Sequence, residues 1–205
     1  SMLAVQALGV EDGAQVLDIC SAPGGKAIYI SELCPHGKVT ACDLYSHRVA
    51  LIQKYKNRMH TPNVKAVEAD ACVYNADWDK TFDFVLCDAP CSCLGTFKKH
   101  PDVFLNKTEK SVKELCRTQA KIIENAGKYL KVGGAMVYST CTLFREENED
   151  IVNDFLARHS DFACEHISGL EKIDNGKYLD NQGMIRILPH GEYDGFFIAK
   201  IRRVK

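Results

Sequence analysis

The chain has 205 residues, of which 46% are hydrophobic and 26% charged, and its formal net charge is -1. These proportions are typical of a globular protein and exclude a disordered chain, a collagen and a coiled coil. No apolar run approaches the roughly 18 residues of a membrane span, and no signal-peptide pattern is recognisable. We therefore expect one compact cytoplasmic domain without membrane association.

The apolar runs alternate with helical patterns, which predicts an α/β protein whose parallel sheet is covered on both faces. After a short apolar stretch, Leu3–Leu8, we expect strands at Val16–Cys20, Lys38–Asp43, Val64–Asp70, Phe82–Cys87 and Ala135–Thr140, then a final strand pair at Met184–Leu188 and Gly195–Ile201. The expected helices are Lys26–Leu33, Ser46–Arg58, Ser111–Leu130 and Arg145–Arg158, the last with Glu146 and Glu147 in its first turn.

Lysine and arginine (26) nearly balance aspartate and glutamate (27), which argues mildly against a free-standing nucleic-acid binder but allows a local basic patch. One side of the helix at Ser111–Leu130 carries five basic residues, namely Lys110, Lys113, Arg117, Lys121 and Lys128. Since Glu114 and Glu124 share that side, it is either a solvated face or a stripe that contacts phosphates.

Ten cysteines are present, without any C-x-x-C pair, and several lie inside apolar segments. A regular α/β pattern with such thiols fits a reducing compartment better than a secreted disulfide scaffold. Most of these cysteines are expected to be buried as small hydrophobic residues.

A glycine-rich turn follows the first expected strand. Asp18-Ile19-Cys20 runs into Ser21-Ala22-Pro23-Gly24-Gly25-Lys26, where two glycines let the backbone approach a ligand. Asp43 ends the next strand, where a carboxylate can accept hydrogen bonds from ribose, and Asp70 ends the third strand at the same edge. This predicts a nucleoside site that is neither a dinucleotide fingerprint nor a P-loop. The alternatives are a turn that serves packing only and Asp70 as a helix cap.

Two cysteine-bearing clusters follow later strands. Asp88-Ala89-Pro90-Cys91-Ser92-Cys93 ends the fourth strand, and Ser139-Thr140-Cys141-Thr142 ends the fifth. In a doubly wound sheet these strands are neighbours, so Cys91 and Cys141 should face each other across one pocket, although a lone cysteine at a strand end is usually structural. Cys91 and Cys93 supply too few ligands for tetrahedral zinc, even with His100 nearby, and we expect no metal.

These motifs, in this order, resemble the Sun (Fmu, RsmB) family of ribosomal RNA cytosine-5 methyltransferases. Glu146-Glu147-Asn148-Glu149 and the ending Asp194-Gly195-Phe196-Phe197-Ile198-Ala199 are also similar to that family, and the similarity runs from about Val16 to Ile201. The resemblance implies a Rossmann-like S-adenosylmethionine-dependent fold with a mostly parallel seven-stranded sheet and an antiparallel strand near the C-terminus. It also implies 5-methylcytosine formation in ribosomal RNA, with small-subunit 16S rRNA favoured over transfer RNA.

The resemblance also implies roles for individual residues. Cys141 would attack C6 of cytosine, Cys91 would assist elimination, Asp88 would hydrogen-bond the base, and Lys26 would support either Asp88 or the base. The cofactor S-adenosylmethionine would contact residues in the four strand-end motifs, namely Cys20, Ser21, Ala22, Pro23, Gly24, Gly25, Lys26, Asp43, Arg48, Asp70 and Asp88.

The sequence departs from the family's pattern at two positions. Cys93 stands where glycine is usual, and Ala27 where threonine is common. The family's N-terminal RNA-binding domain is absent from residues 1–205, so we expect a monomeric catalytic domain that is a fragment of a longer protein and has reduced RNA binding. Two other functions remain open: a methyltransferase acting on a protein or small molecule, and a non-catalytic RNA-binding or ribosome-assembly module.

Overall fold

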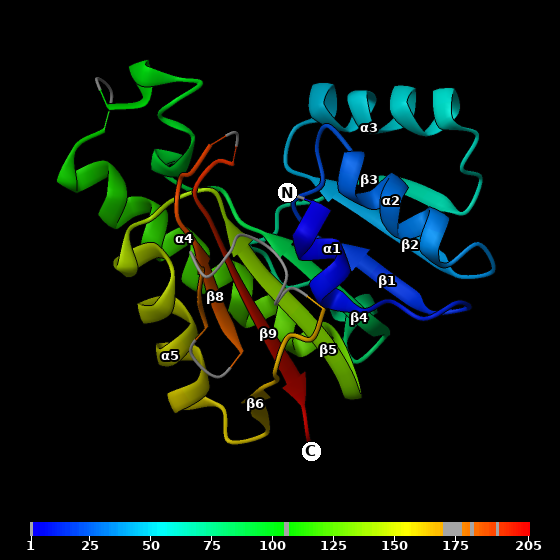
Figure 1. Ribbon diagram of the computed structural model, residues 1–205. Helices are drawn as coiled ribbons and strands as arrows, with labels where there is room; N and C mark the ends of the chain where they lie inside the picture. The colour runs from blue at the N-terminus through cyan, green and yellow to red at the C-terminus, as the bar shows by residue number, and fades with distance from the viewer. Residues whose placement is uncertain (1, 105–106, 170–177, 181–182, 192) are drawn as a thin grey trace.

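The computed structural model describes residues 2–104, 107–169, 178–180, 183–191 and 193–205 (Figure 1). Five parallel strands form the centre of the sheet: β1 (Gln15–Asp18), β2 (Lys38–Asp43), β3 (Val64–Glu68), β4 (Phe82–Asp88) and β5 (Leu130–Thr140). The strand order is β3-β2-β1-β4-β5-β9-β8-β7. The predicted α/β class with a mostly parallel sheet is therefore confirmed.

The last strands of the chain are antiparallel. β9 (Phe196–Arg203) pairs with β5, and β8 (Met184–Ile187) pairs with β9, as the sequence predicts. Two three-residue strands, β6 (Phe162–Cys164) and β7 (Tyr178–Asp180), extend the sheet to nine strands among the described residues, where the sequence predicts seven. Three residues are too few to display an alternating pattern, which is why these two strands escape prediction.

Helices cover both faces of the sheet (Figure 1). α1 (Met2–Leu8), α2 (Gly25–Leu33) and α3 (Ser46–Met59) pack on one face, and α4 (Glu109–Tyr129) and α5 (Glu149–Arg158) pack on the other. Four single-turn 3-10 helices lie between them: η1 (Ala76–Trp78), η2 (Leu94–Thr96), η3 (Pro101–Phe104) and η4 (Arg145–Glu147).

The core consists of two apolar layers separated by the sheet. Val16 of β1 faces the α1–α3 layer, whereas the next residue, Leu17, faces the α4 layer, and both are fully buried. Because central parallel strands are buried on both faces, they read as continuous apolar runs rather than alternating ones. Because β1–β5 run parallel, their carboxyl ends lie at one edge of the sheet.

One local prediction is wrong. The apolar stretch Leu3–Leu8, for which the sequence predicts no element, belongs to helix α1. The expected helix at Arg145–Arg158 is interrupted at Asn148, whose φ of -118° and ψ of -100° separate η4 from α5. Glu147 is therefore a fully buried residue of η4 and does not stabilise a helix N-terminus from the solvent side.

No helix within the described ranges is long and apolar enough to cross a membrane. All ten cysteines carry free thiols. Six of them are only partly buried, so the expectation that most are fully buried holds for four, Cys34, Cys42, Cys87 and Cys91.

Candidate active site

A cavity of about 560 Å³ lies at the carboxyl edge of the sheet. Its walls come from the loops that follow β1, β2, β3, β4 and β5, and from α4. This is the edge at which doubly wound sheets bind their ligands. Eight of the residues predicted for the site line it, namely Cys20, Ala22, Asp43, Arg48, Asp70, Asp88, Cys91 and Cys141.

The remaining predicted residues lie outside the lining of this cavity. Ser21 is buried, and Pro23 lines a separate surface groove with residues of α3. Gly24 adopts a φ of +108°, and a Cβ there would lie 3.2 Å from the Ile52 Cα. Only glycine therefore fits this turn comfortably, and its conformation serves the packing of α3 against the loop.

Asp43 holds the β1 loop and faces the cavity. Its Oδ2 accepts a hydrogen bond from the Ala22 backbone N–H at 3.2 Å, and its Oδ1 lies 3.3 Å from Nη1 of Arg48. Asp70 also lines the cavity, and its Oδ1 accepts the Cys72 N–H at 2.8 Å. Asp70 caps no helix, because a turn and irregular structure follow it, so the helix-cap alternative is wrong, while contact of Asp70 with the cofactor stays a prediction.

Asp88 ends β4 with both carboxylate oxygens engaged. Lys26 Nζ lies 2.6 Å from Oδ2, and Ser139 Oγ donates to Oδ1 at 2.6 Å. Burial lowers the pKa of Lys26, but the neighbouring Asp88 carboxylate raises it, and the net change is upward. Lys26 therefore stays charged and fixes the Asp88 carboxylate. The predicted contact of Lys26 with Asp88 is present, and Ser139, which the sequence singles out only as part of the Cys141 cluster, is a second partner of Asp88.

Cys91 and Cys141 meet across the cavity as predicted, with their Sγ atoms 3.4 Å apart. This follows from the pairing of β4 with β5, in which Asp88 lies opposite Ser139. Cys93 joins them, since the three Sγ atoms all lie within 4.8 Å of one another. Cys93 has a φ of +62°, which is uncommon for a residue other than glycine.

The three thiols share hydrogen bonds, so their ionisations depend on one another. Hydrogen bonds from Cys141 and then Cys91 lower the pKa of Cys93, with help from the positive charges of Lys107 and His100. For Cys141, the hydrogen bond with Cys91 lowers the pKa, whereas Cys93 and burial raise it, and the net direction is upward. One negative charge is therefore stabilised within the cluster, and further charges are opposed.

Glu147 joins the two cysteine loops from behind the cavity. Its carboxylate accepts hydrogen bonds from the Ser92 backbone N–H at 2.9 Å, from the Ser92 hydroxyl, and from Gln119 Nε2 at 2.9 Å. Ser92 Oγ also lies 2.7 Å from the Thr142 hydroxyl. The loop containing Cys91 and the loop containing Cys141 are thus held by one buried polar network.

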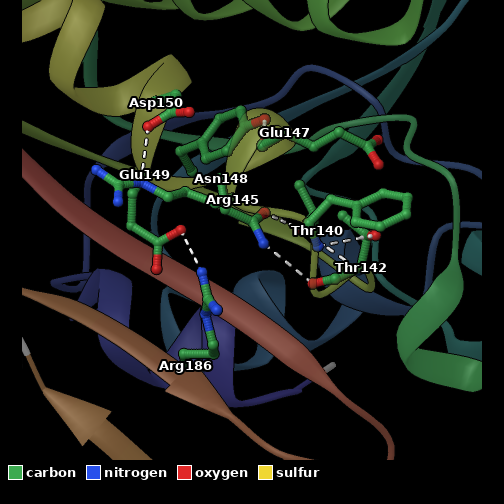
Figure 2. A network of polar contacts seen from close by, with 10 residues as sticks. Thr140, Thr142, Arg145, Glu147, Asn148, Glu149, Asp150 and Arg186 are labelled. Atoms are coloured by element: carbon green, nitrogen blue, oxygen red, sulfur yellow. Dashed lines mark hydrogen bonds and ion pairs between the residues drawn. The ribbon is translucent and has the colours of Figure 1, made fainter. Parts of the chain in front are cut away.

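Asn148 extends this network along the Cys141 loop (Figure 2). It accepts a hydrogen bond from Thr140 Oγ1 at 2.6 Å and donates one to the Thr142 carbonyl at 3.1 Å. The side chains of both Glu147 and Asn148 are fully buried. The sequence contains this pair in the run Glu146-Glu147-Asn148-Glu149, but nothing in the local pattern shows that it faces inward.

Gly95 connects the Cys141 loop to the C-terminal segment through backbone hydrogen bonds. Its N–H donates to the Cys141 carbonyl at 2.8 Å, and its own carbonyl accepts the Gly195 N–H at 2.8 Å. A Cβ on Gly95 would lie 2.2 Å from the Gly195 oxygen. A glycine at this position therefore allows the two backbones to touch, which links the C-terminal Asp194-Gly195 segment to the cysteine loops.

The basic side of α4 is exposed at all five predicted positions. Lys113 pairs with Glu109 at 2.5 Å, and Lys128 lies 3.6 Å from Glu124. These two ion pairs agree with a solvated face at Lys113 and Lys128. Contact of this side of α4 with phosphates stays a prediction.

Many methyltransferase families share this fold, and comparison with family models shows to which of them the chain belongs. The family described as 16S rRNA methyltransferase RsmB/F matches residues 5–202. The chain belongs to the RsmB/F family.

Relatives in this family are longer than the chain. Ribosomal RNA small subunit methyltransferase B of Pectobacterium carotovorum is 36% identical over 95% of the chain and 43% of its own length. Ribosomal RNA small subunit methyltransferase F of Serratia proteamaculans is 36% identical over 99% of the chain and 43% of its own length. The chain thus spans less than half of these two curated RsmB/F relatives.

The fold of solved structures agrees with the family. NSun6 from Pyrococcus horikoshii, solved with SFG, superposes with a TM-score of 0.83 at 34% identity, covering the whole of this chain and 51% of that one. SFG is an analogue of S-adenosylmethionine, and RsmB/F proteins are S-adenosylmethionine-dependent methyltransferases.

The residues of the cavity fit such a cofactor. Its volume of about 560 Å³ lies within the range of small-molecule sites. Among the lining residues, the Asp43 and Asp70 carboxylates could accept hydrogen bonds from ribose hydroxyls or adenine amino groups, and Ile19, Ala69 and Ile122 are apolar surfaces against which a planar base could pack. Asp88 also lines this cavity, and its negative charge would favour a positively charged sulfonium nearby.

Proposed function

We propose that the chain carries the catalytic centre of an enzyme that methylates C5 of a cytosine in 16S ribosomal RNA, with S-adenosylmethionine as the methyl donor. The main support is the meeting of two thiols, 3.4 Å apart, beside Asp88 in a cavity that fits the donor. A methyltransferase of a protein or small molecule has no need of that paired arrangement, and the family match also disfavours it.

The chemistry requires a nucleophile because C5 of cytosine reacts too weakly with a sulfonium methyl group unaided. Cys141 gives up its thiol proton to solvent and adds to C6 as the thiolate, forming an S–C6 bond, while N3 of the ring accepts a proton from solvent and C5 becomes enamine-like. S-adenosylmethionine, when bound, supplies an electrophilic methyl group to C5. Cys91 then removes the C5 proton, the S–C6 bond breaks, the proton at N3 is released, and Cys141 leaves as a thiolate.

Asp88 stabilises the protonated ring by hydrogen bonding at the N3 and N4 edge. Each carboxylate oxygen can accept two hydrogen bonds, so the bonds from Lys26 and Ser139 leave capacity for the base. Lys26 orients the Asp88 side chain through their contact of 2.6 Å. The target cytosine has to reach this cavity, and it is therefore unpaired or flipped out of its helix.

Two cysteine variants test the mechanism on 16S rRNA. Cys141→Ser should abolish methyl transfer, whereas Cys91→Ala should accumulate a protein–RNA adduct that survives denaturing electrophoresis. Cys116→Ser, which changes a partly exposed thiol on α4, is the matched control and should behave as the wild type. Full activity of Cys141→Ala would contradict the mechanism.

Cofactor binding distinguishes the proposed enzyme from the remaining alternative, a non-catalytic RNA-binding or ribosome-assembly module. Calorimetric titration with S-adenosylmethionine should give one site per chain. The absence of binding would favour the non-catalytic module over an enzyme.

A further inference from the structure

Three thiols converge at one point of the cavity. Cys91 and Cys93 come from the loop after β4, and Cys141 comes from the end of β5. The Cys91 and Cys141 sulfurs are 3.4 Å apart, and all three sulfurs lie within 4.8 Å of one another. Among the described residues, these three cysteines are the group of histidine, cysteine or acidic side chains whose ligand atoms lie close enough together to hold one metal ion.

The separations suit a thiophilic ion. Zinc bound by thiolates has Zn–S distances of about 2.3 Å with tetrahedral angles, which places neighbouring sulfurs about 3.8 Å apart. The observed 3.4 Å pair and the 4.8 Å upper limit enclose that value. A shift of about 1 Å or less per sulfur, within the reach of χ1 adjustments, would complete the geometry.

Cys93 makes this arrangement possible. Its positive φ turns the chain so that the Cys93 thiol lies 3.4 Å from the Cys91 carbonyl oxygen and close to the other two thiols. The sequence alone leaves Cys91 and Cys93 short of ligands, because Cys141 is distant in the chain. The fold supplies it as the third ligand, while His100 is not part of the group.

We propose that Cys91, Cys93 and Cys141 form a three-thiolate site that binds Zn²⁺, with water in the fourth position. All three residues line or border the cavity, so the fourth position faces space that a water molecule can occupy. Binding requires all three sulfurs as thiolates and releases to solvent the protons of those that are still thiols, and the complex with Zn²⁺ carries a single negative charge. Sites with three protein ligands and one open position are common among zinc proteins.

Metal binding itself does not depend on the proposed methylation chemistry. The expected effect of the metal on methyl transfer rests on the proposed function. Cys91 and Cys141 cannot act on a cytosine while they hold an ion. Zinc should therefore inhibit methyl transfer, and a chelator should restore it.

The test is titration of the reduced protein with Cd²⁺, which reports thiolate ligation through an ultraviolet charge-transfer band. The wild type should bind one equivalent of Cd²⁺ with release of protons to solvent. Loss of an outer partner of a metal ligand already weakens affinity about 10–100-fold, so Cys93→Gly and Cys141→Ser should each weaken it by about 100-fold or more. Cys116→Ser should leave the titration unchanged.

Cys93→Gly is expected to fold because glycine readily adopts the positive φ found there. Binding of S-adenosylmethionine and circular dichroism confirm that each variant is intact. An unchanged Cd²⁺ band in Cys93→Gly and Cys141→Ser, or no band in the wild type, overturns the site.

The two proposals fail separately. Loss of Cd²⁺ binding in the variants, together with full methyl transfer by metal-loaded wild type, would support the metal site and overturn the proposed cysteine chemistry. No Cd²⁺ binding, together with an inactive Cys141→Ser variant, would overturn the metal site and leave the methylation mechanism standing.

Discussion

Glu147 binds Ser92 across a separation of 55 residues, and it does so through both the backbone N–H and the hydroxyl of the serine. Ser92 lies between Cys91 and Cys93. Glu147 is the last residue of η4, the short helix that follows the Cys141 loop. The relative position of the Cys91 and Cys141 thiols is therefore set by a buried carboxylate that does not touch them. Glu147 is a positioning residue.

Glu147→Ala should lower stability and catalysis together. The substitution leaves the buried Ser92 N–H without its acceptor and the Gln119 amide with only the Pro90 carbonyl, at a cost of about 2–4 kcal/mol in the free energy of unfolding. The rate of methyl transfer should fall because the Cys91 loop is no longer held. Urea denaturation and single-turnover assays at saturating cofactor measure the two effects.

Glu146→Ala is the matched control, since Glu146 is the exposed neighbour in the same 3-10 helix. It should retain wild-type stability and rate. Equal stability of the two alanine variants would show that the network around Glu147 contributes nothing.

Lys26→Met should reduce the rate of methyl transfer by about 100-fold or more, because preorganised charges in closed sites commonly contribute that much. The change removes the cation 2.6 Å from Asp88 and leaves a partly buried carboxylate without its partner. Single-turnover kinetics with excess S-adenosylmethionine separate this effect from cofactor affinity.

Lys131→Met is the corresponding control. Lys131 forms a similar ion pair, 2.7 Å from Asp83, at the opposite end of β4. Its loss should leave the rate within about twofold of wild type, since partly exposed ion pairs contribute little. If Lys131→Met lost as much of its rate as Lys26→Met does, the Lys26–Asp88 ion pair would affect the rate only through the stability of the protein.

The sequence predicts the fold and the meeting of Cys91 with Cys141 for one physical reason. Parallel strands buried on both faces leave long apolar runs, and their carboxyl ends must gather at one edge. The contacts of Glu147 could not be predicted, because its sequence neighbours resemble the first turn of a helix while its partners lie far along the chain. The contribution of Cys93 likewise depends on a positive φ that no local pattern reveals.

Asp43→Asn should weaken S-adenosylmethionine binding by about 10–100-fold. Hydrogen bonds to an ionised acceptor contribute about 1.5–3 kcal/mol, and this carboxylate is nearly inaccessible to water except through the cavity. Isothermal titration calorimetry measures the change. Asp83→Asn, remote from the cavity, should bind as the wild type does, and unaltered binding by Asp43→Asn would remove Asp43 from the cofactor site.

Asp18 should make stability depend on pH in the neutral range. It is fully buried at the end of β1, and burial raises its pKa to about 7, although the nearby Ser21 hydroxyl acts in the opposite direction. The unfolded chain has a pKa of about 3.9 at this group. Between these values the folded state binds more protons than the unfolded state, so this contribution is present at pH 4 and is lost as the pH rises through 7.

Asp18→Asn removes this dependence. Relative to the wild type, the variant should gain about 1–3 kcal/mol in the free energy of unfolding between pH 5 and pH 8. Urea denaturation at several pH values measures the difference, with the exposed Asp77→Asn as the control. Parallel pH profiles for the wild type and Asp18→Asn would mean that Asp18 is already ionised at pH 5 in the folded protein, and that the polar groups around it compensate for its burial.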